Sequence, residues 1–291
     1  MRIVSSANFY KKMIKRIFYL FVFCWIGIVI SSYLIKFPIS NLIQHISELF
    51  FLLVLLFVSF QIGNFLLGRF NLELSVCLLI PFAVGIGFAL LSVVTFFLGV
   101  FGFLYREVFY VLTLVLFIFS LALVRRSKSI GKVCLFPTFN LWGVFLTIIF
   151  FVFFATAFVG ALTPPTFYDS LVYHLAIPID YIKNHQIVKV NSNLFSNFPQ
   201  NIEMLYTAAI LLCDDILANV IHFTFFPLTV LLIYGFLKEK FNNGVASVAA
   251  VIFSTTPAVV MLASGSYIDL GLTFYLFLSF IALVKWIETQ Q

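Results

Sequence analysis

Long apolar blocks dominate this chain, and they recur from residue 17 to residue 287 with short polar connections between them. A helix needs about 20 apolar residues to cross the hydrocarbon core of a bilayer. Only helices and closed barrels can cross it, because every backbone polar group there needs a hydrogen-bond partner within the protein. Barrel strands would alternate apolar and polar residues, and these blocks do not. The pattern therefore predicts an all-α, polytopic membrane protein.

The composition excludes a water-soluble globular protein. Of the 291 residues, 63% are hydrophobic and 10% are charged, whereas soluble domains carry roughly 25% charged residues. The net charge of +6 does not indicate a nucleic-acid partner, because the basic residues cluster beside the apolar blocks, where they act as topology signals. We expect the lipid bilayer as a partner and no nucleic acid.

The apolar blocks and the basic residues together predict a topology. About eight transmembrane helices are expected, at roughly 17–35, 49–67, 74–98, 108–124, 139–162, 216–237, 245–264 and 269–287. With the N-terminus inside, 13 of the 17 lysines and arginines fall in inner segments, as the positive-inside rule requires. Both termini are then cytoplasmic, in the inner (cell) membrane. One long structured extracytoplasmic loop, residues 163–215, is far longer than most connections, and such loops tend to carry function.

The segment TPPTFYDSLVYHLAIP, residues 163–178, places an acid directly after the fifth predicted span. Asp169 begins a helix-compatible stretch, which is expected to end near Pro178 because proline cannot donate a backbone hydrogen bond. Asp269 begins the eighth predicted span on the same side of the membrane. Each acid is either a helix N-cap or a functional carboxylate kept at the membrane edge. In the second case both should share one outer cavity.

Further polar residues near these acids are candidates for contact with a substrate. Tyr173 lies four residues after Asp169, on the same helical face, where it can orient the carboxylate. His174 and Glu203 lie in the long loop, where each is otherwise a solvated or capping residue. A polar stripe of Asp215, Asn219 and His222 follows one face of the sixth predicted span, either for packing between helices or for lining a cavity. The candidate substrate-binding residues are Tyr173, His174, Glu203 and His222.

The series FYDSLVYHLAIP, FPQNIEMLY and SYIDLGLTF, in this order, resembles the opening of the bacterial GT-C membrane glycosyltransferases. This superfamily includes the protein O-mannosyltransferases, the aminoarabinose transferases of lipid A and the oligosaccharyltransferases. The resemblance covers about residues 139 to 287. It implies a hexosyl- or pentosyltransferase of the cell envelope, which moves a sugar from a polyprenyl-phosphate carrier to an acceptor at the extracytoplasmic face.

The resemblance also assigns roles to individual acids. Asp169 matches the family's first-loop acid, which acts as catalytic base or activates the acceptor. Asp269 matches the second outer acid, which helps to hold a metal or the acceptor in some members. The resemblance therefore makes Asp169 and Asp269 the candidate catalytic residues and the candidate ligands of a divalent metal, Mg²⁺ or Mn²⁺. Glu203 lies near a segment where some members carry another acid.

The resemblance covers only the N-terminal part of the family's module, which continues through further spans. We expect residues 139–291 to be a partial module, preceded by a four-helix membrane region, residues 1–138, of unassigned role. The chain is then a fragment, one part of an enzyme completed by a second subunit, or inactive. Two other functions stay open: a transporter or flippase of lipid-linked saccharides, which broken helices in inverted repeats would favour, and a non-catalytic membrane scaffold subunit.

The charge bias leads to a prediction about topology. A cysteine placed at Ser192, in the long loop, should react with a membrane-impermeant thiol reagent in intact cells. A cysteine placed at Ser129, beside the basic cluster that should stay inside, should react only with a permeant reagent. The measurement is labelling of each variant in a chain without native cysteines. Labelling at Ser129 but not at Ser192 would reverse the predicted orientation.

Overall fold

The computed structural model describes residues 45–70, 74–124 and 141–289, with a few isolated positions before residue 26. The chain divides into two compact units, residues 1–44 and 45–291, and every element below belongs to the second. Apart from isolated positions, the predicted span 17–35 lies outside the described residues. The predicted domain boundary at 138/139 also lies outside them, and helices from both sides of it pack together within the second unit.

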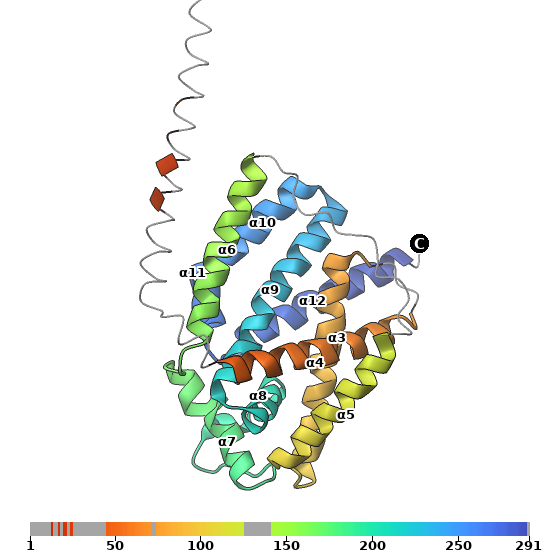
Figure 1. Ribbon diagram of the computed structural model, residues 1–291, viewed down its shortest axis with the longest axis vertical. Coiled ribbons are helices and arrows are strands. Elements are labelled where there is room, and N and C mark those ends of the chain that lie inside the picture. Colours follow the sequence, from red (N-terminus) through yellow and green to blue (C-terminus); the bar gives the residue numbers. More distant parts are fainter. Residues whose placement is uncertain are drawn as a thin grey trace, which may run out of the picture. The chain divides into compact units, whose positions relative to one another are not determined.

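Helices are the only regular elements in the described part of the chain, as the sequence predicts. In chain order they are α3 (Ile46–Leu67), α4 (Val76–Val100), α5 (Arg106–Val124), α6 (Leu141–Ala161), the π-helix η1 (Ser170–His174), α7 (Ala176–Lys183), the 3-10 helix η2 (Leu194–Asn197), α8 (Asn201–Leu212), α9 (Asp215–Lys240), α10 (Asn243–Thr255), α11 (Pro257–Ala263) and α12 (Asp269–Thr289) (Figure 1).

Six of these helices, α3, α4, α5, α6, α9 and α12, are long and apolar enough to cross a membrane. Helices α10 and α11 pass the same test together, but the pair is bent by 65°. The bend follows from Pro257, because proline pushes the residue before it out of the helical region, and Thr256 has an extended backbone with ψ of 120°. The described residues thus allow up to seven crossings. The chain is a multi-pass helical membrane protein.

Small residues allow α3 and α4 to pack with their backbones in contact. A Cβ atom added to Gly63 would lie 1.9 Å from the Ala83 carbonyl oxygen, and one added to Gly87 would lie 2.3 Å from the Ser59 Cα atom. On each helix the two small residues are four positions apart, the spacing typical of close helix pairs in membranes. This contact fixes the position of α4, which forms one wall of the cavity described below.

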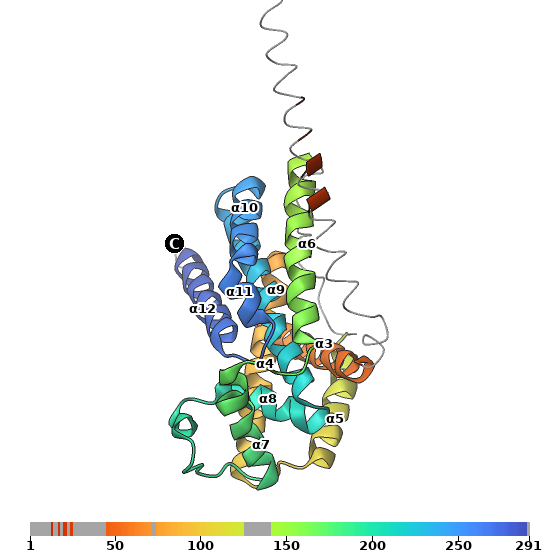
Figure 2. The ribbon, with the colours of Figure 1, turned by 90° about the vertical axis from the view of Figure 1, so that its left-hand side faces the viewer.

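The end of the bundle that carries the site is built from residues 163–215. Helices α7 and α8 lie together at the lower end in both views (Figures 1 and 2), and α8 packs against α4, α7 and α9. The predicted helix end near Pro178 is wrong, since Pro178 lies in the first turn of α7, where the missing N–H has no helical partner to lose. Most of α8 is buried, so this end of the bundle has a protein core of its own.

The α3–α4 contact generates a stability prediction. Gly63→Ala should lower the free energy of unfolding by about 1–3 kcal/mol, because the new methyl group forces two backbones apart. Gly68→Ala is the control at the C-cap of the same helix, since its Cβ would meet only the Asn64 and Phe65 carbonyl oxygens at 3.4 and 3.5 Å. Both are measured by unfolding of the purified protein in detergent. Equal effects of the two substitutions would contradict the close contact.

Candidate functional site

Asp169 stands directly before the π-helix η1 and does not act as its cap. Its backbone is already helical, with φ of −63° and ψ of −39°, and its side chain makes no capping hydrogen bond, whereas an N-cap residue is extended and accepts a backbone N–H. The carboxylate interacts with the Tyr173 hydroxyl instead. Burial, followed by the charge and hydrogen bond of Asp169, raises the pKa of Tyr173 to about 12. Tyr173 therefore stays protonated at neutral pH and can hold the carboxylate in place.

A hydrogen bond joins the segment that carries Asp169 to the turn that precedes Asp269. Ser170, directly after Asp169, donates to the Ser266 carbonyl oxygen at 3.0 Å, in the turn before α12. Asp269 is the first residue of α12 and is exposed. Its charge contributes, after burial and the Asp169 charge, to the raised pKa of Tyr267. Neither acid is among the residues that line the cavity described below, so a cavity shared by Asp169 and Asp269 stays a prediction.

The charge of Asp269 has a structural function as well. Leu272 N donates to the Ile268 carbonyl oxygen at 2.8 Å, which makes Ile268 the N-cap of α12 and places Asp269 in its first turn. A negative charge there is stabilised by the helix dipole. Asp269 is therefore not the N-cap itself, but its charge stabilises the start of α12, whereas Asp169 has no capping role.

A buried pair, His174 and Glu203, joins η1 to α8. The His174 Nδ1 atom lies 2.8 Å from Glu203 Oε1, and the two side chains are 2% and 3% exposed. The interpretation of His174 as a solvated loop residue is therefore wrong. The second carboxylate oxygen, Glu203 Oε2, is buried and has no hydrogen-bond partner among the described residues. Buried polar atoms are almost always paired, so this oxygen has an acceptor position open for a water molecule or a ligand group.

Two residues of the polar stripe on α9, Asn219 and His222, bond to backbone carbonyl groups where other helices end. His222 Nδ1 lies 2.6 Å from the Gly265 carbonyl oxygen, in the turn after α11. Ser266 Oγ donates to Asn219 Oδ1 at 2.5 Å, and Asn219 Nδ2 donates to the Thr163 carbonyl oxygen at 3.1 Å, after the end of α6. Asn219 and His222 are both buried. These contacts favour packing between helices over contact of His222 with a substrate.

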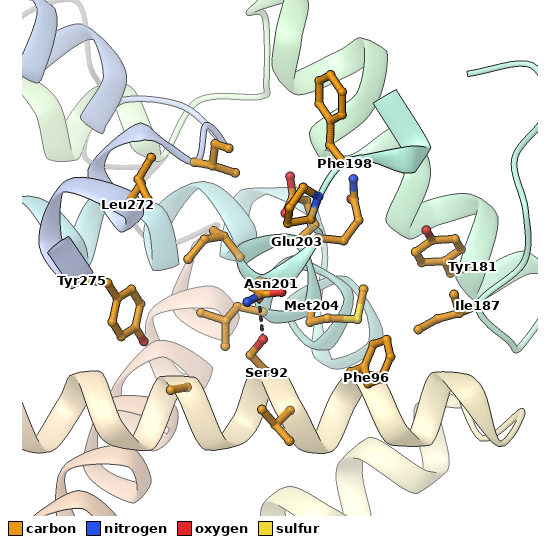
Figure 3. A pocket seen from close by; sticks show the side chains of 17 residues that line it. Ser92, Phe96, Tyr181, Ile187, Phe198, Asn201, Glu203, Met204, Leu272 and Tyr275 are labelled. Carbon is orange, nitrogen blue, oxygen red and sulfur yellow. Dashed lines mark hydrogen bonds between the residues drawn. The ribbon is translucent and has the colours of Figure 1, made fainter. Parts of the chain in front are cut away.

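A cavity of about 720 Å³ lies between α4, α8, α12 and the connection that leads into α8, and its lining includes Ile268, the residue before Asp269, but neither of the two acids (Figure 3). Glu203 stands at its centre in this view, with Leu272 and Tyr275 of α12 on one side and Tyr181 and Ile187 on the other. Most of the remaining wall is apolar. Glu203 thus contacts both the cavity and the His174 side chain that leads back to η1 and Asp169.

Several residues that shape this site were missed by sequence reasoning. Ser92, Gln200 and Tyr275 line the cavity. For Ser92 a signal existed, because polar residues inside a span usually face other helices or a wet cavity. Gln200 lies in the FPQN segment that carries part of the resemblance, but nothing in the sequence indicates its orientation.

The described residues do not assemble a metal centre at Asp169 and Asp269. The compact group of potential metal ligands in this part of the chain is Glu48, Cys213 and Asp214, where α3 meets the junction of α8 and α9. There Asp214 accepts the Leu217 backbone N–H at 3.0 Å as the cap of α9. A Mg²⁺ or Mn²⁺ ion at Asp169 and Asp269 would need its other ligands from a substrate phosphate or water.

Comparison of the chain with family models, with curated proteins and with solved structures found no match.

The buried pair generates a prediction for a double-mutant cycle. His174→Leu leaves Glu203 without its partner and should lower the free energy of unfolding by about 1–3 kcal/mol, because a buried polar group loses its hydrogen bond. Glu203→Leu should be similarly harmful. The double variant should lose clearly less than the sum of the two, since no unpaired group remains. Unfolding in detergent measures all three, and additive losses would show that the two side chains do not form a pair.

Proposed function

We propose that this chain is a GT-C-type glycosyltransferase, or part of one, that moves a sugar from a polyprenyl-phosphate carrier to an acceptor at the extracytoplasmic face. The observation that supports the proposal is the direct bond between the segment that carries Asp169 and the turn before Asp269. Asp169 affects the pKa of Tyr173 and Tyr267, and so does Asp269.

The proposed reaction needs one base and little else. The acceptor hydroxyl oxygen forms a bond to the anomeric carbon of the sugar, and the bond from that carbon to the phosphate oxygen breaks. The hydroxyl proton moves to the Asp169 carboxylate, and the polyprenyl phosphate leaves with the bonding electrons. Phosphate is already a good leaving group, so no general acid of the glycosidase kind is required. No step of the proposed reaction passes through a metal ion.

Asp169 is suited to the role of base because its carboxylate is not used for capping. Tyr173 is its positioning residue: the phenol keeps its proton, with a pKa of about 12, and so presents a donor to one carboxylate oxygen. Asp269, exposed at the first turn of α12, is placed to accept a hydrogen bond from a second hydroxyl of the acceptor or the sugar. The two acids then differ in function although both are aspartates.

The proposed location outside the cytoplasm is supported by the charge distribution. The segment that follows α6, the start of α9, the end of α11 and the start of α12 are linked through Asn219, His222 and Ser266. They therefore lie at one end of the helices. In the topology predicted from the sequence, 13 of the 17 lysines and arginines fall in inner segments, which supports an extracytoplasmic position for the acids.

A second function, transport of a lipid-linked saccharide, is favoured by the break between α10 and α11. Transporters often bind their substrate where a membrane helix is interrupted, and this pair is bent by 65°. The turn that follows α11 also joins the site through the hydrogen bond from Ser170 to Ser266. A transporter would move the saccharide across the bilayer with its bond to the carrier intact.

The substitution Asp169→Asn tests the proposed base. The amide cannot take up a proton at neutral pH, and loss of a general base typically slows a reaction by about 10²–10⁴-fold. We expect a loss of at least about a hundredfold in sugar transfer from a polyprenyl-phosphate sugar. The assay uses the full chain, reconstituted with any subunit that copurifies, at equal amounts of folded protein.

The matched control is Asp180→Asn, an acid of the same loop whose partner is Lys183 at 3.8 Å, and it should leave the rate unchanged. Equal activity of Asp169→Asn and the unaltered chain would contradict the base. Movement of an intact lipid-linked saccharide across proteoliposomes, without transfer in any acceptor mixture, would favour the transporter instead.

A further inference from the structure

Two acceptor atoms of residues that line the 720 Å³ cavity have no donor within the described part of the chain. Glu203 Oε2 and Gln200 Oε1 are both buried and have no hydrogen-bond partner in the described part of the chain. The assignment of the Gln200 amide is fixed by its other end, because Nε2 donates to the Phe195 carbonyl oxygen at 3.2 Å. Its oxygen therefore points elsewhere and can only accept.

Two hydroxyl groups of the cavity lining, those of Ser92 and Tyr275, already donate their protons to backbone carbonyl oxygens. Ser92 Oγ donates to the Asn201 carbonyl oxygen at 2.5 Å, and Tyr275 Oη donates to the Gly85 carbonyl oxygen at 2.9 Å. Each hydroxyl has one proton, so toward the cavity these two oxygens can only accept. Among the lining residues that the structure describes, the Tyr181 hydroxyl and the Asn201 amide are the side-chain donors with no such bond.

The charge of the cavity points in the same direction. No lysine, arginine or histidine is among its described lining residues, and its one ionisable acid is Glu203. An anion placed there would find no basic side chain, only the uncapped backbone N–H groups at the start of α8, and it would lie beside the Glu203 carboxyl group, which is unfavourable in a partly desolvated site. The remaining wall, with Val93, Phe96 and Leu272, offers apolar surface to a hydrocarbon group.

We propose that this cavity binds an amphiphile whose polar end carries hydroxyl or ammonium donors and no negative charge. Donors on the ligand would pair with Glu203 Oε2 and Gln200 Oε1, and its apolar part would contact the wall formed by α4 and α12. If the function proposed above holds, on which this assignment rests, the occupant is the acceptor, because the sugar donor carries a phosphate. Leu272, which lines the cavity, lies one helical turn after Asp269, so a bound acceptor would extend toward the two acids.

The binding test needs no sugar transfer. The full chain, without native cysteines and with a dye on a cysteine at the exposed lining residue Ala89, is placed in phosphatidylcholine nanodiscs. Octylamine, octyl glucoside and octyl phosphate serve as probes with the same tail, and dye fluorescence reports binding. At least one of the first two should bind about tenfold or more tightly than octyl phosphate, since a hydrogen bond to a charged group is stronger than a neutral one.

The test variant is Glu203→Gln, which can keep the contact with His174 and replaces the unpartnered acceptor by a donor. It should weaken the preferred probe about tenfold or more and strengthen octyl phosphate. The control, Glu107→Gln, removes an exposed acid in the first turn of α5 and should change neither. The comparison of probes on the unaltered chain stands even if Glu203→Gln does not fold.

Two results would overturn the proposal: equal or tighter binding of octyl phosphate to the unaltered chain, or no change in probe preference in a folded Glu203→Gln variant. A preference for octylamine identifies an ammonium ligand, and a preference for octyl glucoside identifies a polyol, and either supports the inference. If the unaltered chain shows the probe preference but transfers no sugar, this inference stands and the proposed glycosyltransferase function is refuted. If the chain transfers sugar but shows no probe preference, the glycosyltransferase function stands and this inference is refuted.

Discussion

A bilayer offers no hydrogen-bond partners, so each interruption of a helix in this protein depends on side chains that replace them. Helix α9 supplies these side chains. It is the most buried of the candidate spans, since 78% of its most apolar stretch is buried inside the protein. Asn219 and His222 bond to the backbone where α6 ends and where the chain leaves α11. The arrangement of both acids depends on these contacts, because they set the path of the turn that leads into α12.

The site is assembled from three segments near the N-terminal half of α9. The segment before η1 brings Asp169, the turn before α12 brings Asp269, and α8 brings Glu203. Each is tied to another by a specific bond: Ser170 to the Ser266 carbonyl, Tyr206 to the Tyr267 carbonyl, and His174 to Glu203. Such a bonded network fixes the positions of carboxyl groups more firmly than a flexible loop can, which is what a base acting on a hydroxyl requires.

Glu203 connects the two halves of this region. One of its oxygens is paired with His174, on the η1 side, and the other is unpartnered, while the side chain lines the cavity. A ligand that satisfies the second oxygen would therefore also affect the pair that positions η1. In the proposed enzyme, occupation of the cavity and the geometry of Asp169 are thus mechanically linked, since η1 begins at the residue after Asp169.

The sequence by itself determined that the protein lies in a membrane and that it is helical. Apolar blocks of membrane length leave a helix as the only conformation that satisfies their backbone groups, so the six long helices α3, α4, α5, α6, α9 and α12 follow from the residues. It also predicts that Asp169 and Asp269 lie on one side of the membrane, because both stand at the start of helices there. The tertiary structure decided which acids are caps, which are paired and which oxygens are left over. His174 and Glu203 lie 29 residues apart in a loop without periodicity, and only packing could bring them into contact. Nor could the sequence show that Ser92 and Tyr275 have used their protons on backbone carbonyls. A side chain's hydrogen-bonding capacity is a property of its residue type, but what remains for a ligand depends on which neighbours the fold places beside it.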